Sequence, residues 1–185
     1  LIDRGMVEPA LAMRIHHMVS HDAFTRTLKD IVVFEAHLFE FITRSTIDHV
    51  FADFSGMVYT NCIMSTKNNL KASMELGFLP DGSEPVLLHE VVARSGIASD
   101  LPVDIQTVQY PIYVFKGEKT ETYNEIDYEL YGMNNTEADC IRFILWALTD
   151  STRIQQLQAD YAHLEKVWEA AEKASAVLSN TEVEG

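Results

Sequence analysis

The sequence predicts an α/β (α+β) protein in which a mixed sheet is flanked by helices and followed by an acidic helical extension. Three observations predict this class. Apolar residues recur every three or four positions in residues 27–44, which is typical of a helix with one buried face. Residues 57–65 and 105–117 are rich in β-branched and aromatic side chains, which favour strands. Residues 151–178 carry a heptad-like apolar repeat, which indicates a second, longer helix.

The first 25 residues are weakly patterned, although LAMRIHHMV (11–19) alternates loosely and is compatible with a strand. The helix expected over residues 27–44 has a broad apolar face, formed by Leu28, Ile31, Phe34, Leu38, Phe41 and Ile42. Residues 48–54 either extend this helix or form a separate short turn, which Gly56 ends. The following segment, 57–65, predicts a buried strand.

The segment STKNNLKASMELGFLPDG (65–82) predicts a short helix over residues 67–76, with Gly77 as its C′ glycine and a turn after it. Residues 84–94 indicate a strand, but a helix remains open because short apolar runs are ambiguous. We expect residues 96–104 to form a loop. The last strand of this part spans 105–117, and Pro111 within it suggests a sheet edge or a bulge.

The composition changes after Gly117, which divides the chain into two predicted parts, an α/β domain over residues 1–117 and an acidic helical extension over residues 118–185. The second part carries 14 Asp and Glu residues against 5 Lys and Arg residues. Thr136 and Asp139 resemble a capping box that opens a helix through residue 147.

The apolar seam of the last helix is spaced alternately by three and four residues along Ile154, Leu157, Tyr161, Leu164, Trp168, Ala171, Ser175 and Leu178. A helix of this length, roughly 40 Å at 1.5 Å per residue, needs a partner along its whole seam. That partner is either its own domain or another protein chain. In the second case Ile154, Leu157, Tyr161, Leu164 and Trp168 form the contact, and the protein is an oligomer or part of a larger assembly.

Charge and composition exclude several classes of partner. The net charge of −14 repels phosphate backbones and anionic lipids, so we expect neither direct nucleic-acid binding nor membrane binding. Only two cysteines are present, which suits a reducing compartment, although one disulfide remains open. The sequence shows no signal peptide and begins with Leu1 rather than Met, so a fragment or a processed product is also open. We expect a cytoplasmic or virion-associated protein that is not secreted.

The predicted order of helix, strand, helix, strand and strand over residues 27–117, together with TKNNLKASMELGF (66–78), resembles the GCN5-related N-acetyltransferase family. The resemblance implies an acetyltransferase-like mixed sheet. By the same resemblance, Arg26 and Thr27 at a helix start and Thr66 and Asn68 after a strand are candidate acetyl-CoA contacts, and Ser73 occupies the position of the family's general acid, a tyrosine.

The chain departs from that family where its chemistry lies. The stretch HHMVSHDAFTRT (16–27) contains no glycine, although the family's pyrophosphate loop needs glycines for close backbone approach. Ser73 is a far weaker acid than a tyrosine. The resemblance therefore implies a degenerate acetyltransferase fold with no catalytic residue and no cofactor.

Histidines offer a second chemistry. His16, His17 and His21 lie close together, and a helix would place His17 and His21 on one face as metal ligands. The loose alternation around them favours surface or interface histidines over a metal site. Cys62 lies in an apolar strand and is expected to be buried and unreactive.

These observations lead to two functional hypotheses. The first is a non-catalytic structural or assembly protein, similar in a general sense to the acetyltransferase-like virion proteins of short-tailed phages, which binds other chains through its last helix. The alternative is an acetyl-CoA-dependent N-acetyltransferase that acts on a cationic amine. Whether the protein is an enzyme stays open, with the non-catalytic hypothesis preferred.

Overall fold

The computed structural model describes residues 9–20, 26–100, 112–123, 141, 144, 151–178 and 181–183. The elements in these ranges are β1 (Ala10–Ser20), α1 (Leu28–Thr43), β2 (Ile47–Ser55), β3 (Tyr59–Thr66), β4 (Lys71–Leu79), β5 (Val86–Ala93), β6 (Gly96–Ser99), β7 (Ile112–Lys116), β8 (Lys119–Tyr123), α3 (Ser151–Val177) and β9 (Thr181–Glu182).

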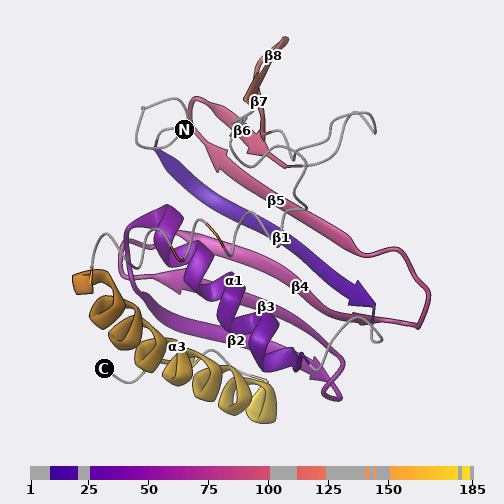
Figure 1. Cartoon of the computed structure of the whole chain (residues 1–185), viewed down its shortest axis with the longest axis vertical. Helices are drawn as coiled ribbons and strands as arrows, with labels where there is room; N and C mark the ends of the chain where they lie inside the picture. Colours follow the sequence, from indigo (N-terminus) through magenta and orange to yellow (C-terminus); the bar gives the residue numbers. More distant parts are fainter. Residues whose placement is uncertain are drawn as a thin grey trace.

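The described strands form one nine-stranded sheet in the order β8-β7-β6-β5-β1-β4-β3-β2-β9 (Figure 1). Strand β1 lies at its centre, parallel to β4 and antiparallel to β5. The other neighbouring pairs are antiparallel. The sheet is therefore mixed, and the predicted α+β class with flanking helices is confirmed.

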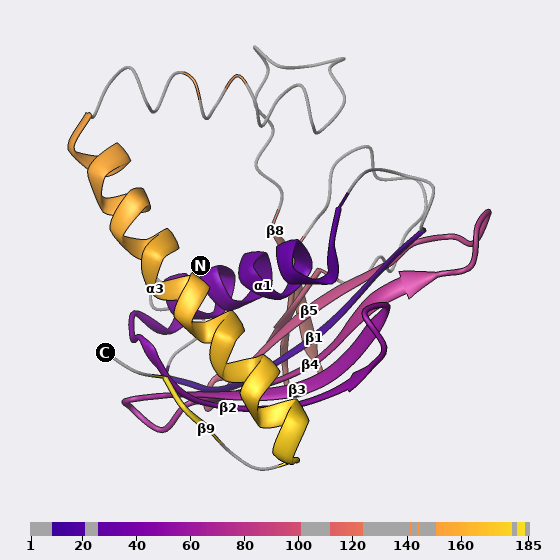
Figure 2. The same ribbon diagram turned by 90° about the horizontal axis from the view of Figure 1, so that it is seen from below.

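Both long helices lie on the same face of the sheet (Figure 2). Helix α1 begins at a capping box between Thr27 and Asp30. Helix α3 lies beside α1 and along β2, where the Trp168 ring stacks on Phe54 with 5.3 Å between centroids. None of the helices in the described part combines the length and apolar character that a membrane span requires.

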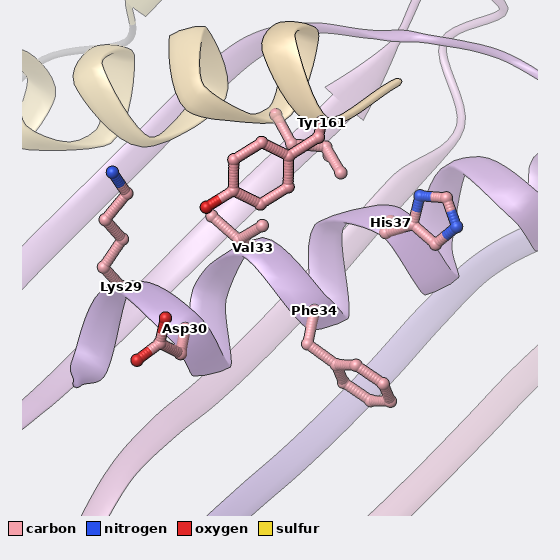
Figure 3. A pocket seen from close by; sticks show the side chains of 7 residues that line it. Lys29, Asp30, Val33, Phe34, His37 and Tyr161 are labelled. Carbon is pink, nitrogen blue, oxygen red and sulfur yellow. The ribbon is translucent and has the colours of Figure 1, made fainter. Parts of the chain in front are cut away.

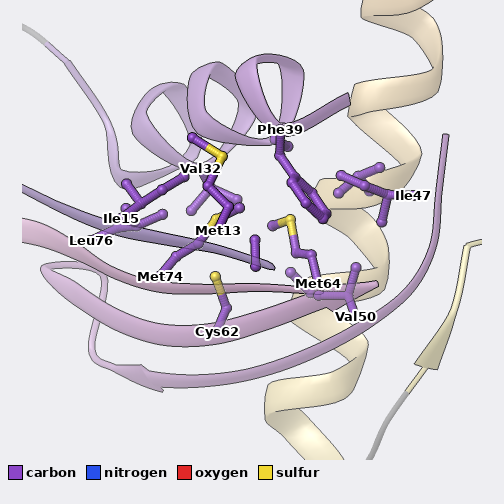
Figure 4. Packing of buried hydrophobic residues seen from close by; sticks show 14 of the residues in the cluster. Met13, Ile15, Val32, Phe39, Ile47, Val50, Cys62, Met64, Met74 and Leu76 are labelled. Carbon is purple, nitrogen blue, oxygen red and sulfur yellow. The ribbon is translucent and has the colours of Figure 1, made fainter. Parts of the chain in front are cut away.

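The hydrophobic core lies between this sheet face and the two helices (Figure 4). Alternate residues of β1 to β4 supply one side of it, because successive side chains of a strand point to opposite faces. Its largest fully buried apolar side chains are Phe39, Met13, Ile15, Leu28, Ile31, Ile47, Met64, Met74, Leu76 and Val32. Cys62 is also in this core, where burial raises the pKa of its thiol to about 12, which agrees with the expectation of an unreactive cysteine.

The prediction of a helix over residues 67–76 is wrong, because Lys71–Leu79 forms strand β4. Residues Ala72, Met74 and Leu76 are buried, and the residues between them point to the opposite face, which is the period of a strand. Gly77 is not a helix C′ residue. A Cβ atom there would lie 2.5 Å from the Val58 carbonyl oxygen in the β2–β3 turn and 2.9 Å from Tyr59 Cα at the start of β3, so the glycine permits this close backbone approach.

Two further expectations are corrected and several are confirmed. Residues 48–54 are part of β2 rather than a helix end or turn, and residues 96–99 are β6 rather than a loop. The expected helices at 27–44 and 151–178 and the strands at 57–65 and 84–94 are present. Residues 112–116 of the expected strand 105–117 are β7, and most of the helix expected over 136–147 lies outside the described residues.

Candidate functional site

A buried carboxylate marks the candidate site. The buried face of α1 comprises Leu28, Ile31, Val32, Glu35, Ala36 and Phe39. Glu35 is the acidic member of this face and has no exposed surface. Because a buried charge is costly unless it is paired and hydrogen-bonded, its partners determine what the site can do.

Two histidines from adjacent strands hold the Glu35 carboxylate. His17 of β1 places its Nδ1 2.5 Å from Oε1. His89 of β5 places its Nε2 3.1 Å from Oε2 and 3.3 Å from Oε1. The strand register explains this approach, since His89 pairs with Ile15, two residues before His17 and on the same face.

Asp100, which follows β6, completes the cluster. Its Oδ2 lies 2.5 Å from His89 Nδ1, and its Oδ1 accepts a hydrogen bond from the His89 backbone N–H at 2.5 Å. The four side chains form a chain of contacts in the order His17, Glu35, His89 and Asp100, which we call the histidine–carboxylate network.

The electrostatics of this network favour charged groups. Burial lowers the pKa of His89, but hydrogen bonds to Asp100 and Glu35 outweigh it and raise the pKa from 6.5 to about 9. Burial raises the pKa of Glu35, but hydrogen bonds from His17 and His89 outweigh it and lower the pKa below its ordinary 4.5. The network therefore contains an ionised carboxylate beside an imidazolium at neutral pH.

His17 lies at one end of the network and contacts Glu35 through Nδ1. Its residue is largely buried, with 8% of its surface exposed. The exposed ring of Phe34 lies edge-on to the imidazole, with 6.2 Å between centroids. A carboxylate holds this imidazole at Nδ1, so Nε2 is the ring nitrogen left to exchange a proton, which is the arrangement of a general acid–base group.

A shallow hollow of about 290 Å³ lies between α1 and α3 (Figure 3). It is lined by Lys29, Asp30, Val33, Phe34, His37, Tyr161 and Leu164. Phe34 belongs both to this hollow and to the surroundings of His17. An ion pair between Lys29 of α1 and Glu165 of α3 links the two helices at one end of the hollow.

The structure separates the histidines that were considered as metal ligands. His16 and His17 point to opposite sheet faces, and His16 Nδ1 contacts Glu75 Oε2 at 3.1 Å on the open face. His21 lies outside the described residues. Within the described ranges no group of three or more His, Cys, Asp or Glu is arranged to hold a metal ion.

The residues suggested by the acetyltransferase resemblance lie at the start of α1, in the β3–β4 turn and on an exposed sheet face. Thr27 caps α1, and the side chain of Arg26 beside it is exposed. Thr66 Oγ1 accepts a hydrogen bond from the Leu70 backbone N–H in the β3–β4 turn, which also contains Asn68. Ser73 is exposed on the sheet face opposite the histidine–carboxylate network.

Helix α3 presents only part of its expected seam to the sheet and α1. Leu164 and Trp168 are buried, whereas Tyr161 is 55% exposed. The side chains of Ile154 and Leu157 lie outside the described residues. Contact of this helix with another chain stays a prediction, as does the division of the chain at residue 117, which falls in the β7–β8 turn.

Sequence reasoning identified His17 as a metal candidate and missed Glu35, His89 and Asp100 as a site. One signal was available: Glu35 follows Ile31 by four residues and therefore falls on the apolar face of the helix. An acidic residue at such a position needs a buried partner. The sequence carried no comparable signal for His89 or Asp100, because β5 and β6 are brought beside α1 only by the sheet order.

Several solved structures that are similar to this chain are oxidoreductases. An oxidoreductase from Agrobacterium radiobacter, crystallised with NAD+, L-tartaric acid and magnesium, matches with a TM-score of 0.73 at 12% identity, over 98% of this chain and 59% of that chain. Levoglucosan dehydrogenase in complex with NADH and levoglucosan matches with a TM-score of 0.74 at 13% identity, over 100% and 61%. Scyllo-inositol dehydrogenase from Lactobacillus casei, with NAD(H) and scyllo-inositol, matches with a TM-score of 0.66 at 13% identity, over 99% and 59%.

No protein-family model and no curated protein sequence matches the chain. At these identities the structural likeness shows the fold alone, and the chain spans about three fifths of the length of the proteins it matches. The likeness nevertheless overturns the acetyltransferase resemblance and both functions built on it, the phage assembly role and N-acetyl transfer. It also overturns the expectation of no cofactor, since these structures contain NAD+ or NAD(H).

The described residues do not fit the pyrophosphate of such a dinucleotide. The capping box at the start of α1 occupies the N-terminal backbone groups that would bind phosphate, and its Asp30 carboxylate accepts a hydrogen bond from the Thr27 N–H at 2.7 Å. The described glycines lie in β4, in β6 and in turns between strands. None of them precedes a helix that could present open amides to a phosphate.

Proposed function

We propose that this chain is the substrate-side part of an NAD(H)-linked oxidoreductase that acts on a polyhydroxylated compound. The observation that carries the proposal is the likeness of nearly the whole chain to oxidoreductases crystallised with NAD+ or NAD(H), with TM-scores of 0.66 to 0.74. The pyrophosphate contacts would come from polypeptide beyond the residues described here.

The histidine–carboxylate network supports this role. Oxidation of a hydroxyl group to a carbonyl releases a hydride and a proton, and a bound nicotinamide would supply the hydride acceptor. In this proposal Nε2 of His17, the ring nitrogen that does not face Glu35, takes that proton, and Glu35 holds the ring at Nδ1 and stabilises the resulting imidazolium. In the reverse reaction the same imidazolium would return the proton to the developing hydroxyl oxygen.

The surroundings of His17 support a polyol or a sugar as the substrate class. L-Tartaric acid, scyllo-inositol and levoglucosan, the compounds found with the similar enzymes, all carry hydroxyl groups on neighbouring carbons. Phe34 exposes 58% of its surface beside His17 and can cover the apolar C–H face of such a compound.

The test is an assay of NAD+ reduction by the protein that contains this chain, with a panel of cyclic polyols, sugars and hydroxy acids. We expect reduction with at least one of them, and His17→Asn should lower kcat/KM by about 100-fold or more, the usual range for loss of an acid–base group. His16→Asn is the matched control, because His16 also contacts a glutamate but on the opposite sheet face. Absence of reduction with every compound, or equal losses in the two variants, would contradict the proposal.

A further inference from the structure

His89 is enclosed by carboxylates at both ring nitrogens. Asp100 faces Nδ1 at 2.5 Å from the end of β6, and Glu35 faces Nε2 at 3.1 Å from α1. Only 16% of the surface of the His89 side chain is exposed. A neutral imidazole carries one N–H and would direct a lone pair at a carboxylate, so between two ionised carboxylates this geometry favours the doubly protonated ring.

We infer that His89 is a positioning residue, a constantly charged imidazolium that keeps Glu35 ionised and thereby fixes the protonation of His17. This inference rests on the proposed function, in which His17 exchanges a proton with substrate. The groups that face His89 are Glu35 from α1 and Asp100 after β6, with His17 of β1 on the far side of Glu35. The raised pKa of His89, about 9, agrees with a ring that stays charged at neutral pH.

The consequence for His17 follows from proton counting. An ionised Glu35 can only accept, so His17 must donate through Nδ1–H, and in the neutral ring Nε2 then carries the lone pair. If His89 lost its charge, the buried Glu35 carboxyl would be driven to take up a proton. A protonated Glu35 would donate to Nδ1, the remaining N–H would move to Nε2, and His17 could no longer accept a proton from substrate.

The direct test is nitrogen-15 NMR of the histidine rings in the whole chain, which reports each tautomer without turnover. In the unchanged protein at about pH 7.5 we expect both His89 nitrogens to be protonated and His17 to carry its proton on Nδ1. A neutral His89 ring at that pH, whatever the behaviour of any variant, would overturn the inference.

The variant test uses His89→Gln, which keeps a hydrogen-bonding side chain and removes the charge. We expect the His17 proton to move to Nε2, kcat/KM to fall by about 100-fold, and the ascending limb of its pH profile to shift. His16, which contacts Glu75 on the other sheet face, is the internal control and should keep its ring signals. An unchanged His17 tautomer in a folded His89→Gln variant would refute the positioning role.

The two readouts separate this inference from the proposed function. If the His17 proton moves to Nε2 in His89→Gln but the unchanged protein does not reduce NAD+, the positioning role of His89 is supported and the oxidoreductase proposal is contradicted. If NAD+ reduction depends on His17 but is unaffected by His89→Gln, the positioning role is contradicted and the oxidoreductase proposal is supported.

Discussion

At the scale of single residues, burial of the Glu35 carboxylate opposes folding unless its charge is paired. Glu35 has no exposed surface, and both of its oxygens are hydrogen-bonded by histidines that lie on strands β1 and β5. Glu75 provides a natural comparison, since it contacts His16 in the same chemical way but its side chain is 47% exposed. The same pair of residue types therefore occurs both inside the molecule and on the opposite, more exposed sheet face.

This contrast gives the first stability prediction. Glu35→Gln should lower the free energy of unfolding by about 3–5 kcal/mol, because removing one partner from a buried charge pair leaves the other uncompensated. Glu75→Gln should change it very little, since exposed pairs contribute little. Urea unfolding of both variants measures the difference, and equal effects would show that the buried pair is not important for stability.

At the scale of elements, β4 shows what the sequence could and could not predict. Its residues Lys71, Ala72, Met74, Glu75 and Leu76 favour helices by intrinsic propensity, and a glycine follows them as it would follow a helix. The alternation of buried and exposed positions, which is equally visible in the sequence, was the better guide. Pairing with β1 and β3 overrides the local preference, and such pairing cannot be seen in the segment itself.

Gly77 tests this account of β4. A Cβ atom at this position would lie 2.5 Å from the Val58 carbonyl oxygen and 2.9 Å from Tyr59 Cα, both of which are backbone atoms. Gly77→Ala should therefore cost about 1–3 kcal/mol of stability, as overpacking does. Ser73→Ala on the exposed face of the same strand is the control, and thermal unfolding measures both. A Gly77→Ala variant as stable as the control would contradict the close strand approach.

The helices were easier to predict than the site. Helix α1 could be recognised from the spacing of its apolar residues, and α3 from its heptad-like repeat. The histidine–carboxylate network draws on β1, α1, β5 and the residue after β6, which are separated along the chain and adjacent only in the sheet order. A single sequence could therefore mark His17 as one of three candidate metal ligands but could not show which carboxylate it meets.

At the scale of the whole molecule, the network should make stability depend on pH in two directions. The pKa of Glu35 is below 4.5 in the folded protein, so its contribution is present above pH 4.5 and is lost as the pH falls through the folded value. The pKa of His89 is raised from 6.5 to about 9, so its contribution is complete below pH 6.5 and is lost as the pH rises through 9.

Both contributions are therefore present together between pH 4.5 and 6.5. Urea midpoints measured across the pH range should be highest in this window and should fall on the alkaline side toward pH 9. His89→Gln should flatten that alkaline decline, and because His89 helps to lower the pKa of Glu35, the acid-side decline should begin at a higher pH in the variant. A decline of the same steepness in the variant would assign it to other groups.

The described residues combine one sheet, two helices on one of its faces and a histidine in contact with a buried carboxylate, and the chain resembles about three fifths of two oxidoreductases crystallised with NAD+ or NADH. The central claim is that a polyhydroxylated compound binds at His17. A titration of the histidine ring signals of this chain with scyllo-inositol or levoglucosan tests it most directly. We expect saturable shifts of the His17 signals with at least one compound and none at His16. Saturable shifts at His16 alone, or no shift at either histidine with any polyol, would contradict the claim.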